Sequence, residues 1–222
     1  MKTYSMKKIA FVSLISFTIL FKCVAQELSI GLKPSFLIVG ARYTENPATT
    51  DNRISSRYSY AIGFTVSDHI NKSFGITIEP RFIVKGYNFD WVSGVTSVQV
   101  IYRNNYFSMP VLFYVSPIHN VNFELGPEIC YLISSKIKDY NINIFQSNEE
   151  PDQKQLEFSI LTGITFSPSN KFGFGVRYGF GLTPFEKSYL ARPFQYYYDY
   201  KIVQRYFEFS LDIRIFNKAL NN

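Results

Sequence analysis

The residue types best suited to acid–base, nucleophilic or metal chemistry are scarce in this sequence. It has two histidines, His69 and His119, and two cysteines, Cys23 and Cys130. A serine nucleophile needs a histidine beside it, and both histidines fall in short turns, away from the long connections. Two cysteines exclude a disulfide scaffold and a cysteine-based zinc site, and two histidines disfavour a histidine-rich metal centre. We therefore expect no enzymatic activity, no metal site and no cofactor.

Charged residues instead recur at alternate positions, which places them on one face of extended strands. Equal numbers of bases and acids predict mutual neutralisation, because buried charges persist when they are paired and hydrogen-bonded. We interpret the set as a structural network in the interior. A narrow or gated ion path, and a catalytic carboxylate pair with a defined separation in an open site, are the alternatives. The twelve residues are Lys33, Arg57, Glu79, Arg81, Lys85, Glu124, Glu128, Glu157, Arg177, Glu208, Asp212 and Arg214.

A third group of candidate residues lies in the connection 185–203, which is rich in tyrosine. Tyrosine and arginine are over-represented in binding hot spots, so this segment is a candidate contact site for a protein partner. The competing interpretation is an aromatic girdle at a membrane surface. The residues concerned are Tyr189, Arg192, Phe194, Tyr196, Tyr197, Tyr198 and Tyr200.

The first 25 residues have the anatomy of a cleaved secretory signal peptide. Lys7 and Lys8 precede an apolar run over 9–21, and Ala25 provides a small residue before the expected cleavage site. This run is too short to span a membrane as a helix, which takes about 20 residues. The signal segment holds four of the 23 basic residues and no acid, so the mature chain carries +2 rather than +6. That near-neutral balance, without a basic cluster, argues against nucleic-acid binding.

The mature chain, residues 26–222, reads as a series of strands that must position these side chains. Apolar residues alternate with polar ones at period two, as in Phe172, Phe174, Val176 and Tyr178, which indicates strands rather than helices. The eight predicted strands are 27–39, 57–67, 73–87, 99–115, 121–134, 155–167, 171–184 and 204–216.

The connections between these strands alternate in length. Short turns are expected near Ser67, Ser116 and Ser167, where Ser, Pro, Asn and Asp favour turns. The long connections are 40–56, 88–98, 135–154 and 185–203. Short turns at one end and long loops at the other are typical of an up-and-down outer-membrane barrel.

One face of the predicted strands carries no charge and is rich in Phe and Tyr. The total volume of its side chains shows whether this face can lie inside the barrel. The interior of an eight-stranded barrel is just wide enough for side chains to fill, so the bulky apolar face must lie outside. Closure also leaves no unpaired backbone group in lipid. We predict an all-β, eight-stranded antiparallel up-and-down transmembrane β-barrel, in contact with outer-membrane lipid. A soluble secreted barrel that binds an apolar ligand is the alternative.

Several segments resemble the PorT-like family of outer-membrane β-barrels. Residues 106–112 (Tyr-Phe-Ser-Met-Pro-Val-Leu) resemble the family's Tyr-x-x-(Ile/Val)-Pro-Leu-Leu strand, and 126–136 its Gly-Pro…Tyr-Leu…Lys strand. Residues 175–183 resemble the penultimate strand. Residues 206–216 are similar to the aromatic-ended signal read by barrel-assembly machinery, although 217–222 follow here. The resemblance implies that this machinery is a partner during biogenesis, and some members of the family are linked to type IX secretion.

We therefore expect an integral protein of the cell outer membrane, exported through a cleaved signal peptide and monomeric. Its role would be structural, adhesive or secretion-accessory and would be exerted through the long extracellular loops, where a protein partner could bind. A narrow channel for ions or small solutes is the alternative function.

Overall fold

In the part of the chain that the computed structural model describes, every regular element is a β-strand. The structure describes residues 27–43, 53–71, 73–93, 96–140, 155–184, 186–187 and 201–219. The predicted signal peptide, residues 1–25, lies outside this part of the chain. Among the described residues, no helix is long and apolar enough to cross a membrane.

The strands follow the predicted ranges in their middle portions and differ mainly at their ends. Their bounds are β1 (Glu27–Tyr43), β2 (Arg53–Ser55), β3 (Arg57–His69), β4 (Phe74–Ile78), β5 (Arg81–Ser93), β6 (Thr96–Ile118), β7 (Val121–Tyr140), β8 (Leu156–Phe166), β9 (Phe172–Gly181), β10 (Glu186–Lys187) and β11 (Lys201–Ala219).

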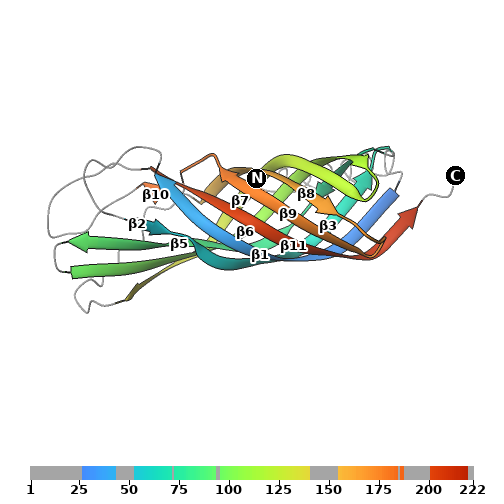
Figure 1. Ribbon diagram of the computed structural model, residues 1–222. Helices are drawn as coiled ribbons and strands as arrows, with labels where there is room; N and C mark the ends of the chain where they lie inside the picture. Colours follow the sequence, from blue (N-terminus) through green and yellow to red (C-terminus); the bar gives the residue numbers. More distant parts are fainter. Residues whose placement is uncertain are drawn as a thin grey trace, which may run out of the picture.

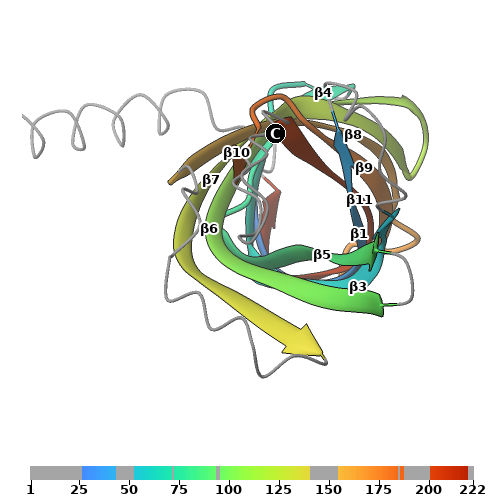
Figure 2. The same cartoon turned by 90° about the vertical axis from the view of Figure 1, so that its left-hand side faces the viewer.

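The sheet closes on itself because β1 pairs with β11 on one side and with β3 on the other. From β3 the ring continues through β4 and β5, which share one position, to β6, β7, β8, β9 and β11. All these pairings are antiparallel. Figure 1 shows the barrel from the side, and Figure 2 shows the ring of strands from one end. The prediction of an eight-stranded antiparallel barrel is confirmed.

The predicted strand 73–87 is interrupted at Glu79 and Pro80, which separate β4 from β5. Proline has no N–H to donate to a ladder. Its carbonyl still accepts from Phe64 at 3.0 Å, and the Glu79 N–H donates to the Pro110 carbonyl at 3.0 Å. The interruption is therefore local, and β4 and β5 together occupy one position in the wall.

The predicted long connection 88–98 is wrong, because most of it is a β-hairpin. β5 and β6 remain paired from Arg81 and Ser108 out to Ser93 and Thr96. β2 joins the side of β5 through Arg53 and Asp90, and β7 pairs with β6 up to Tyr140. Figure 1 shows β5 and β6 projecting beyond the barrel wall at the left. We call this four-stranded sheet of β2, β5, β6 and β7 the extension.

The opposite end of the barrel carries the short turns, as predicted. β6 and β7 are joined by two residues, His119 and Asn120, and Asn120 has a φ of 67°. Asparagine tolerates this left-handed conformation better than most residues do. Glu27 and Ala219 pair at this same end, so the two described chain ends lie together there.

Candidate functional site

The barrel interior is filled by charged side chains from six positions of the wall, and it is the candidate site in the described structure. Nine of the twelve charged residues that the sequence assigns to one face are buried in the interior. They are Lys33, Glu79, Arg81, Lys85, Glu124, Glu128, Glu157, Arg177 and Glu208.

The first half of this network centres on Arg177 of β9. Its guanidinium donates to both carboxylate oxygens of Glu79, at 2.6 and 2.8 Å, and its Nε donates to Glu124 at 2.6 Å. Lys33 of β1 donates to Glu79 at 2.8 Å, and Thr165 donates to Glu124 at 2.8 Å. The two-pronged Arg–carboxylate contact is the strong form of this interaction. These contacts join β1, β7, β8 and β9 with Glu79, which lies between β4 and β5, across the interior.

The second half centres on Arg81 at the start of β5. Arg81 Nη1 contacts both oxygens of Glu208 at 2.8 Å, while Nη2 donates to Glu128 at 2.7 Å and to the Tyr206 hydroxyl at 2.9 Å. Tyr206 passes a hydrogen bond on to Glu128 at 2.7 Å. Ser108 donates to the same carboxylate. Every charged group here has several partners, which is what burial of charge requires.

Lys85 of β5 extends this second half toward the long-loop end. Its ammonium lies 3.2 Å from Glu157 and 3.6 Å from Glu128. It also donates to the Cys130 sulfur at 3.2 Å. The ring centroids of Tyr106 and Tyr206 lie 5.4 and 5.2 Å from the ammonium, within the range of a cation–π interaction. Cys130 is buried in this contact and serves as part of the packing.

The other three predicted residues face inward outside this network. The Arg57 guanidinium donates to the Tyr102 carbonyl at 3.4 Å near the long-loop end. At the short-turn end, Arg214 lies 3.6 Å from Asp212 and donates to Ser167 at 2.7 Å. These contacts are longer or more exposed than those of the central residues.

Apolar side chains and glycines complete the interior. A buried apolar cluster includes Leu37, Ile83 and Leu161, so the lumen is filled by packing as well as by charge. Gly179 lies opposite Tyr206, and a Cβ at that glycine would collide with the tyrosine ring. The glycine therefore provides space for one of the network residues.

A polar vestibule of about 140 Å³ leads into the barrel from the short-turn end. Lys33 and Glu79 of the network form part of its lining. His69 also lines it, at 5.4 Å between ring centroids from Tyr114. The prediction that His69 falls in a short turn is therefore wrong, because β3 continues to that residue and its side chain lines the vestibule. His119 is exposed in its turn.

No group of three or more His, Cys, Asp or Glu residues within the described ranges could hold a metal ion. The carboxylates of the network are engaged by Arg and Lys, which leaves no open pair flanking a substrate-sized space. The arrangement can hold the wall together and close the lumen.

Sequence reasoning missed the uncharged members of the network. Tyr206 bridges Arg81 and Glu128, and Ser35 donates to Glu208 at 2.7 Å. Both lie at the same alternate positions as the charged residues, and this periodicity was the available signal. Which carboxylate each would meet depends on strand order around the ring.

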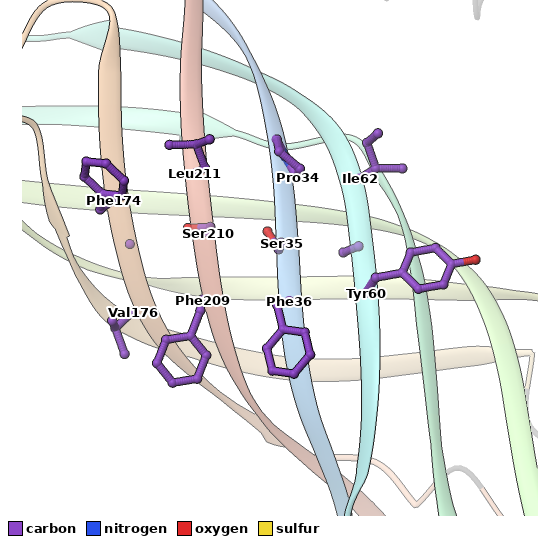
Figure 3. A pocket seen from close by; sticks show the side chains of 12 residues that line it. Pro34, Ser35, Phe36, Tyr60, Ile62, Phe174, Val176, Phe209, Ser210 and Leu211 are labelled. Atoms are coloured by element: carbon purple, nitrogen blue, oxygen red, sulfur yellow. The ribbon is translucent and has the colours of Figure 1, made fainter.

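The outer wall is apolar, and side chains on it stand in rows across the strands. A shallow groove of about 740 Å³ runs between two rows over β9, β11, β1 and β3. Figure 3 shows Leu211 and Pro34 on one side of it and Phe209 and Phe36 on the other. Its floor is low because Ser35 and its neighbours at the same level turn inward. The groove belongs to the apolar belt that the sequence assigns to lipid.

The outer face is not free of charge over its whole length, which corrects the sequence interpretation. Arg103 of β6 and Arg205 of β11 lie within predicted strands and belong to the outer face. Arg42 and Lys136 are exposed where β1 and β7 run past their predicted ends. All four lie toward the long-loop end, past exposed apolar residues such as Phe107 and Phe207.

The tyrosine-rich candidate contact site lies outside the described residues. This applies to Tyr189, Arg192, Phe194, Tyr196, Tyr197, Tyr198 and Tyr200. Its proposed role in partner binding stays a prediction.

Comparison with protein families gives a match over most of the chain. The model of the family described as "Outer membrane protein beta-barrel domain" matches residues 24–187. Comparison with curated protein sequences gave no match.

Solved structures of similar shape are bacterial outer-membrane or surface proteins. Ail, the attachment invasion locus protein of Yersinia pestis, is 11% identical, with a TM-score of 0.43 over 86% of this chain and 99% of Ail. The outer membrane protein OprG from Pseudomonas aeruginosa is 8% identical, with a TM-score of 0.45 over 86% of this chain and 96% of OprG. Neisserial surface protein A is 7% identical, with a TM-score of 0.43 over 84% of this chain and 97% of that protein.

Proposed function

The chain belongs to the outer membrane protein beta-barrel domain family, and from this premise we propose that it is a non-conducting barrel that acts at the cell surface. It is an integral outer-membrane β-barrel protein. The proposal adds that the lumen is closed, that the chain is not an enzyme, and that its role is structural, adhesive or secretion-accessory. The PorT-like subfamily, export by cleavage after residue 25 and a monomeric state are part of the same proposal.

One observation carries the closed lumen: the two-centred network of Arg177 and Arg81 crosses the interior. Arg177 connects β9 to Glu79 and to Glu124 of β7. Arg81 connects β5 to Glu208 of β11 and to Glu128 of β7. Displacing such groups to admit a hydrated ion would separate buried charges from their partners, which costs several kcal/mol per ion.

Planar-bilayer recording tests this closure. We expect the purified full-length barrel to show no stepwise conductance. A variant in which Arg81 and Arg177 are both replaced by Ala, provided that it still folds, should conduct because the bulk across the lumen is gone. Steady conductance of the unaltered protein would overturn the proposal.

A narrow channel is the second candidate, and the vestibule favours it. This cavity is polar and reaches Lys33 and Glu79 from the short-turn end. A channel would require the remaining path past Arg81 and Lys85 to open. The recording described above decides between the two functions, because only a channel conducts without substitution.

A surface role is supported by the extension, which continues the wall at the long-loop end. A sheet that leaves the barrel offers a surface for contact with another protein. A photo-crosslinking residue at Tyr198 tests the tyrosine-rich connection in intact cells. We expect a specific crosslinked product there and none from Ser169, which is exposed at the short-turn end. Identical product patterns from the two positions would argue against a surface partner.

A further inference from the structure

Four cationic side chains on the outer face form two pairs of neighbours. Arg103 of β6 and Lys136 of β7 are direct partners across the two strands. Arg42 of β1 lies opposite Val203, and Arg205 of β11 lies opposite Gly40, so these two arginines are diagonal neighbours. Like charges at such positions repel each other. An anion bound at each pair would reduce this repulsion, so both pairs should attract anions.

The two pairs lie at one level and on opposite sides of the barrel. The β11–β1 seam carries one pair and the β6–β7 seam the other, and two wall positions lie between the seams in either direction around the ring. Moving away from the short turns, each pair follows exposed apolar residues on the outer face of its strands, such as Phe107 on β6 and Phe207 on β11. We infer that this height is the boundary between hydrocarbon and headgroups.

Each pair contains one arginine that is positioned by an aromatic side chain of the outer face. The Arg205 guanidinium lies 4.5 Å from the ring centroid of Phe180. Arg103 Nη2 donates to the Tyr60 hydroxyl at 3.4 Å. Within the described part of the chain, no carboxylate forms an ion pair with any of the four cations. The described residues therefore leave the charge of these cations without an acidic partner.

We propose that these two cation pairs are binding sites for the phosphate-bearing headgroups of outer-leaflet lipid, one lipid molecule at each seam. A guanidinium matches phosphate with two parallel hydrogen bonds, and a second cation beside it adds charge attraction. Basic side chains at a membrane surface each add about 1 kcal/mol of attraction to anionic lipid. The proposal rests on the outer-membrane location and is independent of whether the lumen conducts.

A lipid fits these positions better than a soluble anion or a protein does. Each pair lies directly beyond apolar side chains of its own seam, so one ligand could place acyl chains on the belt and its phosphate at the pair. The groove between the Leu211 and Pro34 row and the Phe209 and Phe36 row crosses the same β11–β1 seam. At the short-turn end, the described outer face carries no comparable pair, so the preference would apply to one leaflet.

Native mass spectrometry of the detergent-solubilised full-length barrel with lipid A tests the proposal. We expect up to two bound lipid A molecules per barrel. R42Q/R205Q and R103Q/K136Q should each lower the maximum to one, and the quadruple variant should bind none above background. K171Q, which removes an exposed cation at the short-turn end, is the matched control and should retain two.

Two further measurements distinguish the possible outcomes. Heat-dependent gel mobility should show that every variant is folded, since all four side chains lie on the outer surface. Inorganic phosphate at tenfold excess should not displace lipid A, whereas a site for free phosphate would be emptied. Unchanged lipid binding by the folded quadruple variant, or an equal loss in K171Q, would overturn the proposal. A conductance result for or against a closed lumen leaves this test unaffected.

Discussion

The barrel holds charged residues in two regions that follow opposite rules. In the lumen, Arg81 and Glu208 are buried, and each is held by several partners at 2.7–2.9 Å. On the outer rim, Arg103 and Lys136 are exposed and stand side by side with the same sign. The first region resolves its charges inside the protein, while the second presents them to the surroundings.

The comparison teaches that the same residue type has different consequences on the two faces of one strand. A buried arginine whose partners remain is expensive to remove, because the carboxylates stay behind without compensation. An exposed arginine is already solvated, and its loss changes stability little. Stability should therefore depend on the lumen charges, and recognition should depend on the rim charges.

The largest effect should come from Arg81→Met. The substitution leaves Glu128 and Glu208 buried without their main cation, and we expect a loss of about 3–5 kcal/mol in the free energy of unfolding. Urea titration followed by heat-dependent gel mobility measures it. Arg103→Met is the rim control and should change the value by less than about 0.5 kcal/mol. Similar losses in the two variants would erase the distinction between the regions.

A charge introduced on the lipid face should have the next largest effect. Phe209 lies on the outer wall in the middle of the apolar belt, at 45% exposure. Phe209→Arg should lower the free energy of unfolding in lipid vesicles by about 2–4 kcal/mol, because a cation at the bilayer midplane is poorly solvated. Tyr58→Arg, near the long-loop end, should cost only about 0–1 kcal/mol. Equal costs at the two heights would contradict the assignment of the belt.

Loss of space inside the lumen should have a smaller effect. Gly179→Ala places a Cβ against the Tyr206 ring and should cost about 1–3 kcal/mol through overpacking. Gly173→Ala is the matched control on the same strand. A Cβ added at Gly173 would lie 3.2 Å from its nearest neighbour, the Ser167 hydroxyl oxygen, and would not collide with a ring. Denaturant titration of the two variants gives the difference, and an equally stable Gly179→Ala barrel would show that Tyr206 can move freely.

The smallest lumen effect should be at the short-turn margin. Asp212 and Arg214 are separated by 3.6 Å and are partly exposed. Asp212→Asn should therefore cost less than about 1 kcal/mol, as for ion pairs in contact with water. A titration that shows a loss as large as that for Arg81→Met would place this pair within the central network.

Sequence periodicity could predict the barrel because a strand in a bilayer has only two faces. The alternation through Phe172, Phe174 and Val176 assigned those side chains to the outer wall, where the structure has them exposed. Strand ends were harder to predict. The extension of β5 and β6 through 88–98 is held by backbone pairing between neighbouring strands, and the apolar alternation weakens there.

The site could be predicted in its composition and not in its connections. Arg177 and Glu79 are 98 residues apart, and their contact depends on which strands face each other across the ring. Tyr206 resembled any other inward-facing aromatic residue until the structure placed its hydroxyl between Arg81 and Glu128. Local sequence has no information on the Arg177–Glu79 contact or on the position of the Tyr206 hydroxyl.

By itself, the sequence determined the architecture: period-two alternation, bulky apolar side chains on one face and balanced charges on the other admit an outward-facing belt and a filled lumen. Only the tertiary structure decided which charges neutralise each other and which remain available. The reason is that pairing follows from ring closure, strand order and register, which bring distant positions to the same height inside the barrel. The same register places Arg103 beside Lys136 on the outside, where the described residues supply no carboxylate to pair with them.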